Sequence, residues 1–278
     1  ALGLAHEILE WGGVKPRSGV QQAARAARYA LLGRFARCVR AGAILVAHTE
    51  DDQAETVLMR LLRGSGLKGL AGMDNVAILN GVPVFRPLLT ASKARLVATC
   101  EARGWRYLVD PSNDNPGFLR ARLRRIAPLL AQEGLTPARL SRLAGRMRRA
   151  DDALDGEALA VMERSRIWRT GETVYDAAGL AAAHEEIVVR VFQHVLALGR
   201  GADSGHVHPR LERIEALALD FRRAVVDGVS FRRNAGGLLF TLRKGELVLR
   251  SEPARRPRRL NLTADCSAPP LGNGAEGA

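Results

Sequence analysis

The stretch that decides the fold is AHTEDDQAETVLMRLLRGSGLKGLAGM, residues 47–73. It begins where a short apolar run, AILVAH (43–48), ends, and such a run is typical of a strand buried on both faces of a sheet. Residues 51–63 then have helical spacing, and glycines follow them. A buried strand that leads directly into a helix indicates an α/β domain. The start of that helix would lie at the carboxyl end of the sheet, where such folds bind ligands.

The helix over 51–63 has two different sides. We expect its apolar side to pack on the sheet and its other side to face a cleft. The apolar side consists of Ala54, Val57, Leu58, Leu61 and Leu62. The other side consists of Asp52, Glu55, Thr56, Met59 and Arg63. Asp52 and Glu55, with His48 just before them, suit either a Mg²⁺ ion that carries nucleotide phosphates or the ammonium group of a substrate. An alternative needs no ligand: Asp51 or Asp52 caps the helix and complements its dipole.

The glycines after this helix predict a sharply turning loop. Gly64 is placed to end the helix, and Gly66, Gly69 and Gly72 leave the following backbone free to turn. The spacing is not that of a Walker phosphate-binding loop, GxxxxGK[ST]. The glycines therefore indicate loop geometry and do not by themselves indicate a nucleotide site.

The rest of the chain divides into two predicted domains and a tail. Strands are expected over 5–11, 43–48 and 105–113, with a loop or strand over 82–89, and helices over 18–42 and 92–104. Their alternation predicts a parallel sheet with flanking helices over residues 1–130. Residues 131–253 read as mainly helical, at 138–164 and 177–224 with a glycine-rich break at 199–205, followed by a small hairpin over 229–252. Residues 254–278 lack periodicity and are expected to be disordered.

Charge is the strongest signal in the composition. Forty-two Lys and Arg residues against 29 acids give a net charge of +13. This excess favours a polyanionic partner, above all nucleic acid, although a protein whose surface is merely basic would have the same composition. The chain has no run of about 18 apolar residues, so no membrane span is predicted. The first residues do not resemble a signal peptide. Cys38, Cys100 and Cys266 form no pair or metal-binding spacing, so we expect a cytoplasmic protein.

Arginines concentrate after a turn-rich segment at 110–116. Residues 120–150 hold nine arginines and one acid: Arg120, Arg122, Arg124, Arg125, Arg139, Arg142, Arg146, Arg148, Arg149 and Glu133. Guanidinium groups bind phosphate in a bidentate way, so this stretch is a candidate contact for an RNA backbone or a triphosphate. Arg25 and Arg28 lie at i and i+3 of the 18–42 helix, where they form either part of the site or a solvated face.

With these residues in view, the chain resembles the tRNA(Ile)-lysidine synthases. Residues 47–73 are similar to that family's signature, AHHxxDQxETxLxRLxRGxGxxGLxGM. Three flanking segments are also similar to segments of the family and occur in the same order, one before the signature and two after it. They are LEWGGVKPRSGVQQAARAARY, VFRPLLTASKARL and WRYLVDPSNDNPGFLRARLR. The resemblance covers residues 5–252. It implies an N-type ATP-pyrophosphatase (PP-loop) domain followed by a helical domain that contacts tRNA.

The resemblance also implies a reaction and a set of site residues. Members use ATP to adenylate the C2 oxygen of the wobble cytidine in a CAU-anticodon isoleucine tRNA, and free L-lysine then displaces AMP. By the family pattern, Asp52, Glu55, Arg28 and Arg120 would be catalytic, and His48 would bind substrate or ATP. Among the arginines named above, Arg25 and Arg122 are further candidates for binding substrate or ATP, and Arg124, Arg125 and Arg146 are candidate tRNA contacts. Asp52 and Glu55 would also bind Mg²⁺, and a homodimer is left open.

Three departures from the family pattern affect these expectations. Thr49 replaces the second His of the signature, and Ala121 replaces an Asn. The family's ATP loop, SGGxDS, does not occur in the 278 residues. The resemblance therefore implies an N-terminally truncated domain that binds ATP poorly, which a micromolar dissociation constant for ATP would contradict. The alternative function is a non-catalytic, basic tRNA-binding module. The related tRNA thiolases are disfavoured because this chain has no paired cysteines.

Overall fold

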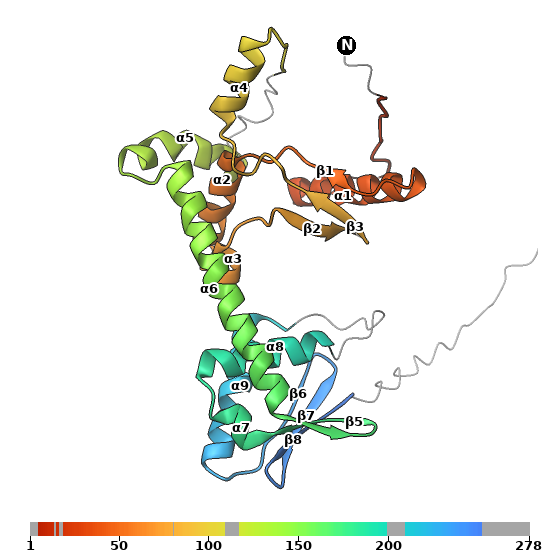
Figure 1. Cartoon of the computed structure of the whole chain (residues 1–278), viewed down its shortest axis with the longest axis vertical. Helices are drawn as coiled ribbons and strands as arrows, with labels where there is room; N and C mark the ends of the chain where they lie inside the picture. The colour runs from red at the N-terminus through yellow and green to blue at the C-terminus, as the bar shows by residue number, and fades with distance from the viewer. Residues whose placement is uncertain are drawn as a thin grey trace, which may run out of the picture. The chain divides into compact units, whose positions relative to one another are not determined.

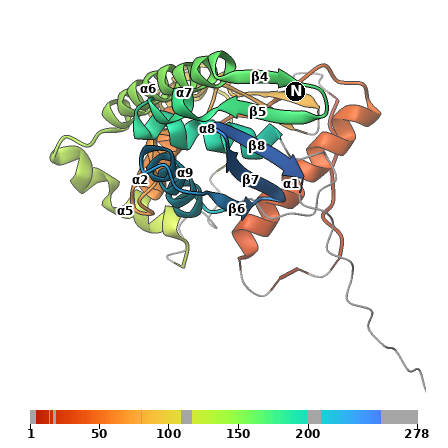
Figure 2. The ribbon, with the colours of Figure 1, turned by 90° about the horizontal axis from the view of Figure 1, so that it is seen from below.

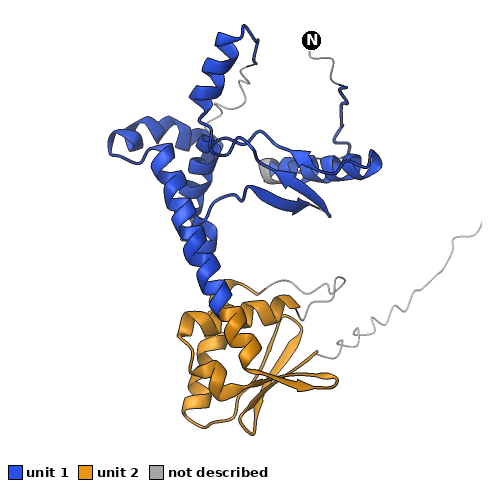
Figure 3. Cartoon of the chain, in the orientation of Figure 1, with its two compact units in different colours: residues 1–157 blue, residues 158–278 orange. Residues whose placement is uncertain are grey.

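The computed structural model describes residues 5–13, 15–16, 19–79, 81–108, 117–198 and 209–251. The chain forms two compact units, residues 1–157 and 158–278 (Figure 3). The division falls within the long helix α6 (Pro137–Arg164), whereas the sequence placed a boundary at residue 130. Helix α5 (Leu119–Gln132) and the first turns of α6 pack with the first unit, because they cover helix α2 (Glu50–Leu61).

A three-stranded sheet forms one part of the first unit. Its order is β1 (Ile44–Leu45), β3 (Val82–Phe85) and β2 (Val76–Leu79). Strand β1 runs parallel to β3, and β2 runs antiparallel to it. Helix α1 (Val20–Cys38) lies along one face of this sheet (Figure 1), where its Ala36 packs with Ile44, Val82 and Val84. The predicted strand–helix alternation is therefore present, in a mixed sheet.

One prediction is wrong because the face of this sheet opposite to α1 is exposed. The run 43–48 was expected to be a strand buried on both faces, but β1 has two residues, and Leu45 is 70% exposed. Leu45, Phe85 and Val76 are neighbours across the three strands, and all three are exposed. Among the described elements, α1 covers only the opposite face, so this face keeps its apolar side chains in solvent.

Two other expected strands do not form. Residues 5–10 and 105–108 have no strand partner in the described chain, and Ile8 and Leu108 are exposed. Alternating side chains alone do not make a strand, because the backbone groups need a hydrogen-bonded neighbour. The remaining helices of the first unit are α3 (Leu67–Leu70) and α4 (Lys93–Ala102).

Helix α2 packs on another helix instead of the sheet. Its Ala54 and Val57 are buried against Leu140 and Ala144 of α6. The expectation that the apolar side of this helix packs on the sheet is therefore wrong. Leu61 and Leu62, at the end of the predicted apolar side, are exposed. The consequence for function is that α6 fixes one side of the helix that carries the acidic motif.

The second unit combines helices with an antiparallel sheet. Five antiparallel strands lie side by side in the order β4-β5-β8-β7-β6 (Figure 2). They are β4 (Arg166–Arg169), β5 (Glu172–Asp176), β6 (Arg232–Ala235), β7 (Leu238–Arg243) and β8 (Glu246–Ser251). The helices are α7 (Ala177–Ala181), α8 (Glu185–Leu198) and α9 (Leu211–Val226). Phe192 of α8 stacks on Phe240 of β7 and meets Phe221 of α9, with ring centres 5.2 and 5.3 Å apart.

The sequence predicted the last three of these strands as a hairpin and missed β4 and β5. The turn-rich segment 110–116, the glycine-rich break at 199–205, Cys266 and the tail from 254 lie outside the described residues. No helix in the described part of the chain combines the length and the apolar character that crossing a bilayer requires.

Candidate active site

The acidic motif forms the first two turns of α2. Four of its side chains each bind a different partner. Thr49 is the N-cap residue, and its hydroxyl accepts from the Asp52 backbone N–H at 3.4 Å. Asp52 Oδ2 in turn accepts from the Thr49 N–H at 2.8 Å and from the Thr49 hydroxyl at 2.9 Å. This is a capping box in which Thr49, and not Asp51 or Asp52, is the N-cap residue, while Asp52 binds back to it from the third helical position. Thr49, which departs from the family pattern, is thus a working part of the helix start.

The residues on either side of Asp52 tie α2 to two other segments. Asp51 Oδ2 accepts from the backbone N–H of Lys93, at the start of α4, at 2.6 Å. Gln53 is buried, and its amide makes two bonds to Met73: it donates to the carbonyl at 3.0 Å and accepts from the N–H at 2.7 Å. The start of α2 is therefore fixed to α4 and to the glycine-rich loop at the same time.

Glu55 is bound by arginines of α5. Its side chain is 11% exposed, and it accepts from Arg124 Nε at 2.5 Å and from Arg124 Nη2 at 3.3 Å. Arg120 Nε lies 3.9 Å from the other carboxylate oxygen. Two arginines that the sequence assigned to different roles thus meet on one carboxylate. The negative charge of Glu55 is largely balanced within the protein.

His48 lies between the strand end and α2, half-buried, and its Nδ1 has no hydrogen-bond partner among the described residues. Burial lowers the pKa of His48 below its usual 6.5, Asp52 opposes this, and the positive charges of Arg25, Arg86 and Arg120 lower it further. The ring is therefore neutral near pH 7. A buried, neutral imidazole with an unused nitrogen can exchange a proton or a hydrogen bond with a bound ligand.

The three arginines that act on His48 come from three elements. Arg25 of α1 stacks on Tyr29, 5.1 Å from the ring centre, and Arg120 belongs to α5. Arg86 follows β3, is only 9% exposed, and donates to the Asp74 carbonyl at 2.6 Å. Arg86 lies in the segment VFRPLLTASKARL, and its residue type and position predicted no role for it. Its burial depends on the fold of the loop around it, which no local pattern predicts.

The glycine-rich loop is held by further arginines. Arg60 of α2 donates to the carbonyls of Gly69 and Gly72, each at 2.7 Å, and Arg148 of α6 donates to those of Ala71 and Met73. Gly64 and Gly72 have positive φ, as expected for loop-turning positions. Arg148 was counted among the candidate RNA or triphosphate contacts, whereas in the structure it binds protein backbone.

The structure brings together some of the predicted residues and leaves others apart. His48, Asp52, Arg25 and Arg120 interact electrostatically in one place, and Glu55 and Arg124 border it through Arg120. Arg28 is exposed on α1, where Arg25 is the arginine that acts on His48. Arg122 donates to the Gly117 carbonyl at 3.2 Å. Arg125 and Arg146 are exposed on α5 and α6, where a polyanion can reach them.

The arrangement does not fit a Mg²⁺ ion on Asp52 and Glu55. Both oxygens of Glu55 face arginines, and Asp52 Oδ2 serves the capping box. Within the described ranges, no three His, Cys, Asp or Glu side chains gather in a metal-binding group. Mg²⁺ commonly binds one or two carboxylates together with substrate phosphates and water, so a Mg²⁺ ion that carries the nucleotide phosphates stays a prediction.

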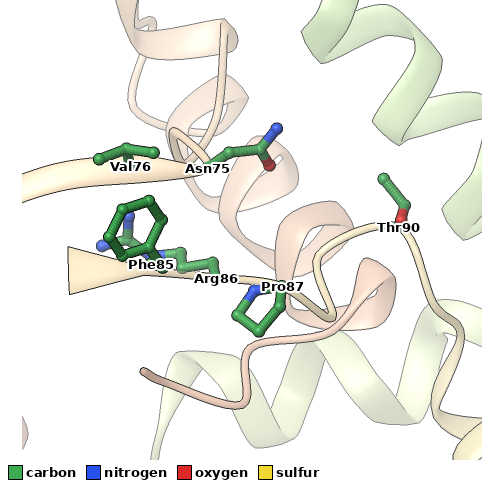
Figure 4. A pocket seen from close by; sticks show the side chains of 6 residues that line it. All are labelled: Asn75, Val76, Phe85, Arg86, Pro87 and Thr90. Carbon is green, nitrogen blue, oxygen red and sulfur yellow. The ribbon is translucent and has the colours of Figure 1, made fainter. Parts of the chain in front are cut away.

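A pocket of about 250 Å³ lies where β2 begins and β3 ends (Figure 4). The cross-strand neighbours Val76 and Phe85 form its apolar side, and Asn75, Arg86, Pro87 and Thr90 complete it. Arg86 thus lines the pocket and also acts electrostatically on His48, while the predicted site residues lie outside the pocket lining.

The chain is similar to known proteins over most of its length. The PP-loop domain family matches residues 1–130. A tRNA(Ile)-lysidine synthase of Methylobacterium sp. (strain 4-46) is 52% identical over 259 residues, which cover 92% of this chain and 74% of that protein. Those of Bradyrhizobium sp. (strain BTAi1 / ATCC BAA-1182) and Rhodopseudomonas palustris are 42% and 41% identical, over 92% and 93% of this chain and 75% and 76% of theirs. The chain belongs to the tRNA(Ile)-lysidine synthase family, whose members are ATP-using ligases that modify tRNA.

Proposed function

We propose that this protein forms lysidine at the wobble cytidine of a CAU-anticodon isoleucine tRNA. ATP adenylates the C2 oxygen of the base and releases pyrophosphate. The ε-amine of free L-lysine then attacks C2, so that a C–N bond forms and the C–O bond to AMP breaks. The amine loses its protons in the process. The observation that carries this proposal is the half-buried His48, which lies close enough to Asp52, Arg25, Arg86 and Arg120 for their charges to act on it.

Each part of the cluster suits one requirement of that reaction. The Asp52 carboxylate is half-exposed, so it can attract the lysine ammonium group. His48 is neutral near pH 7, so it can take a proton from the attacking amine. Arg25 and Arg120 are placed to offset the negative charge that develops on the phosphate during adenylation. Arg28 and Arg122 remain candidates for the same cleft through the family pattern alone.

Glu55 has a different task in this proposal. Since Arg124 and Arg120 bind it, it acts on the substrate indirectly, by holding Arg120 at the edge of the cluster. Arg124 is correspondingly a partner of Glu55 more than a contact of tRNA. Exposed Arg125 and Arg146 are the better supported tRNA contacts. Mg²⁺ would enter with the ATP phosphates and stays a prediction, and no step here depends on it.

The proposal includes a domain and a cellular context. Residues 1–130 would act as the catalytic domain and 131–253 as the tRNA-contacting part, in the cytoplasm. A homodimer is a prediction that awaits a measurement of mass in solution. The second candidate function is tRNA binding without catalysis, which the exposed arginines would also serve and which requires no ATP loop.

The test uses the native protein, purified from its own cells, with ATP, radiolabelled lysine and the tRNA transcript. Lysine should enter the tRNA only when ATP is present. Asp52→Asn should abolish the transfer and leave tRNA affinity nearly unchanged. Asp152→Asn, an exposed change on α6, should leave both the transfer and the tRNA affinity nearly unchanged. Because Asp52 also caps α2, the unfolding free energy of both variants is measured alongside. A protein that binds the tRNA and transfers no lysine would support the non-catalytic alternative.

A further inference from the structure

We propose that Arg148 of α6 is a positioning residue for the lysine and nucleotide site. It acts, with Arg60, through the backbone of residues 69–74, which we call the clasped loop. Arg148 would not touch the substrates. It would determine where α2 and Arg86 lie, and with them the site. This inference rests on the proposed function, and it names residues that the sequence analysis gave either no role or a different one.

The clasped loop has buried carbonyl groups that need donors. Ala71, Gly72 and Met73 are buried, and a buried backbone carbonyl must be hydrogen-bonded. Arg148 Nη2 donates to the carbonyls of Ala71, at 2.6 Å, and Met73, at 3.0 Å, and it pairs with the Asp74 carboxylate at 2.9 Å. Arg60 supplies the carbonyls of Gly69 and Gly72. Guanidinium groups from two helices thus donate the hydrogen bonds that a neighbouring strand would donate to these carbonyls in a sheet.

The clasped loop in turn fixes α2. Gln53 makes its two amide hydrogen bonds to Met73, and a side chain on Gly72 would come within 2.7–2.8 Å of that amide. The Gln53 amide therefore fits tightly against Gly72 and Met73. Gln53 directly follows Asp52 and precedes Glu55 by two residues. A shift of the loop would move the turn that carries both carboxylates.

The clasped loop also fixes Arg86. Arg86 donates to the Asp74 carbonyl at 2.6 Å, and its own backbone N–H donates to the Asn75 carbonyl at 2.9 Å. Arg86 is one of the charges that act on His48. The same short loop therefore positions a group on each side of the cluster, and Arg148 is its link to α6.

A direct contact of Arg148 with RNA is the competing explanation. The Arg148 side chain is 29% exposed, and its Nη2 already serves two carbonyls and a carboxylate. Its neighbour Arg149 is exposed on the same helix, so it provides a matched control with the same loss of charge. Arg148→Met keeps the apolar stem and removes the donors, and Arg148→Lys keeps the charge and a donor.

The experiment measures steady-state lysine transfer, tRNA affinity and amide hydrogen exchange for the native protein and the variants R148M, R148K and R149M. We expect R148M to lose roughly tenfold or more in kcat/KM for lysine, because small misplacements of reacting groups have effects of this size. Its tRNA dissociation constant should change less than that of R149M. R148K should recover part of the lost activity. The Met73 and Gln53 amides should exchange faster in R148M than in R149M.

Two results would overturn the inference. The first is R148M kinetics equal to those of the native protein, even with a lowered melting temperature, since Arg148 would then be only structural. The second is a loss of tRNA affinity in R148M that exceeds the loss in R149M. If the native protein transfers no lysine, the proposed function fails. Amide hydrogen exchange then tests whether Arg148 holds the clasped loop in place. Unchanged exchange in R148M would refute it, and faster exchange would support it.

Discussion

Replacing Glu55 by Gln tests the bond between α2 and α5 that shapes the acidic end of the site. Gln keeps the size of the side chain and one acceptor oxygen, but it removes the charge that faces Arg124 and Arg120. Two arginines would then lie close together without their common carboxylate. We expect the variant to fold with reduced stability and to lose the placement of Arg120.

The magnitude follows from how far the pair is buried. Breaking a buried ion pair by removing one partner costs about 3–5 kcal/mol, and breaking an exposed one costs at most about 1 kcal/mol. Glu55 is 11% exposed and Arg124 is 37% exposed, so the pair lies between these limits. We therefore expect a loss of about 2 kcal/mol in unfolding free energy, which is roughly a thirtyfold change in the unfolding equilibrium.

Urea denaturation of Glu55→Gln, Arg124→Met and the double variant forms a double-mutant cycle. The coupling energy should be about 1–2 kcal/mol, as for residues in direct contact. Glu133→Gln, an exposed change at the end of α5, provides the control and should have almost no effect. A coupling energy below about 0.3 kcal/mol, the ordinary error of additivity, would refute the reasoning.

Three further predictions concern pH, backbone and RNA. The pKa of His48 is lowered, so the unfolded chain takes up a proton first as the pH falls, and the stability due to neutral His48 is complete above pH 6.5 and lost below it. His48→Gln should therefore lose less unfolding free energy than the native protein when the pH is lowered from 7.5 to 5.5, and equal losses would contradict this. Gly72→Ala should destabilise by about 2 kcal/mol or more, because φ is 69° and the new Cβ would meet the Gln53 amide. Gly145→Ala, inside α6 with its nearest neighbour at 3.9 Å, should stabilise by about 0.5–1 kcal/mol in the same melting experiment, and the reverse order would be decisive against the loop geometry. Arg125→Ala should weaken tRNA binding and reduce the slope of log affinity against log salt by about 1, and a filter-binding series with an unchanged slope would remove Arg125 from the tRNA contacts.

The sequence predicted several helices because their signals are local, but it did not predict α5, the helix that carries Arg120 and Arg124. Apolar spacing and terminal glycines indicated α1, α2 and α4, and the acidic motif was correctly placed at a helix start after a strand. The strands were harder to predict. Strand β5 pairs Thr173 with Leu249, far along the chain, and neither β4 nor β5 has the continuous apolar run that marks a buried strand. Their formation depends on a partner that local reasoning does not see.

For the site, the sequence identified the groups but not their partners. The motif and the resemblance placed His48, Asp52 and Glu55 together, and residue types alone suggested a metal pair. Arg124 lies 69 positions from Glu55 in sequence, and its bond to that carboxylate follows from the packing of α5 on α2. The roles of Gln53, Arg60 and Arg148 depend in the same way on where the backbone carbonyls of one loop point.

The most direct test of the central claim is the mass of the wobble nucleotide after reaction. The tRNA transcript with a CAU anticodon is incubated with the native protein, ATP and lysine, then digested and analysed by mass spectrometry. The account predicts that the wobble cytidine gains one lysine with loss of water, only when ATP is present, and that Asp52→Asn prevents this gain. An unmodified cytidine in a tRNA that the native protein nevertheless binds would contradict the account.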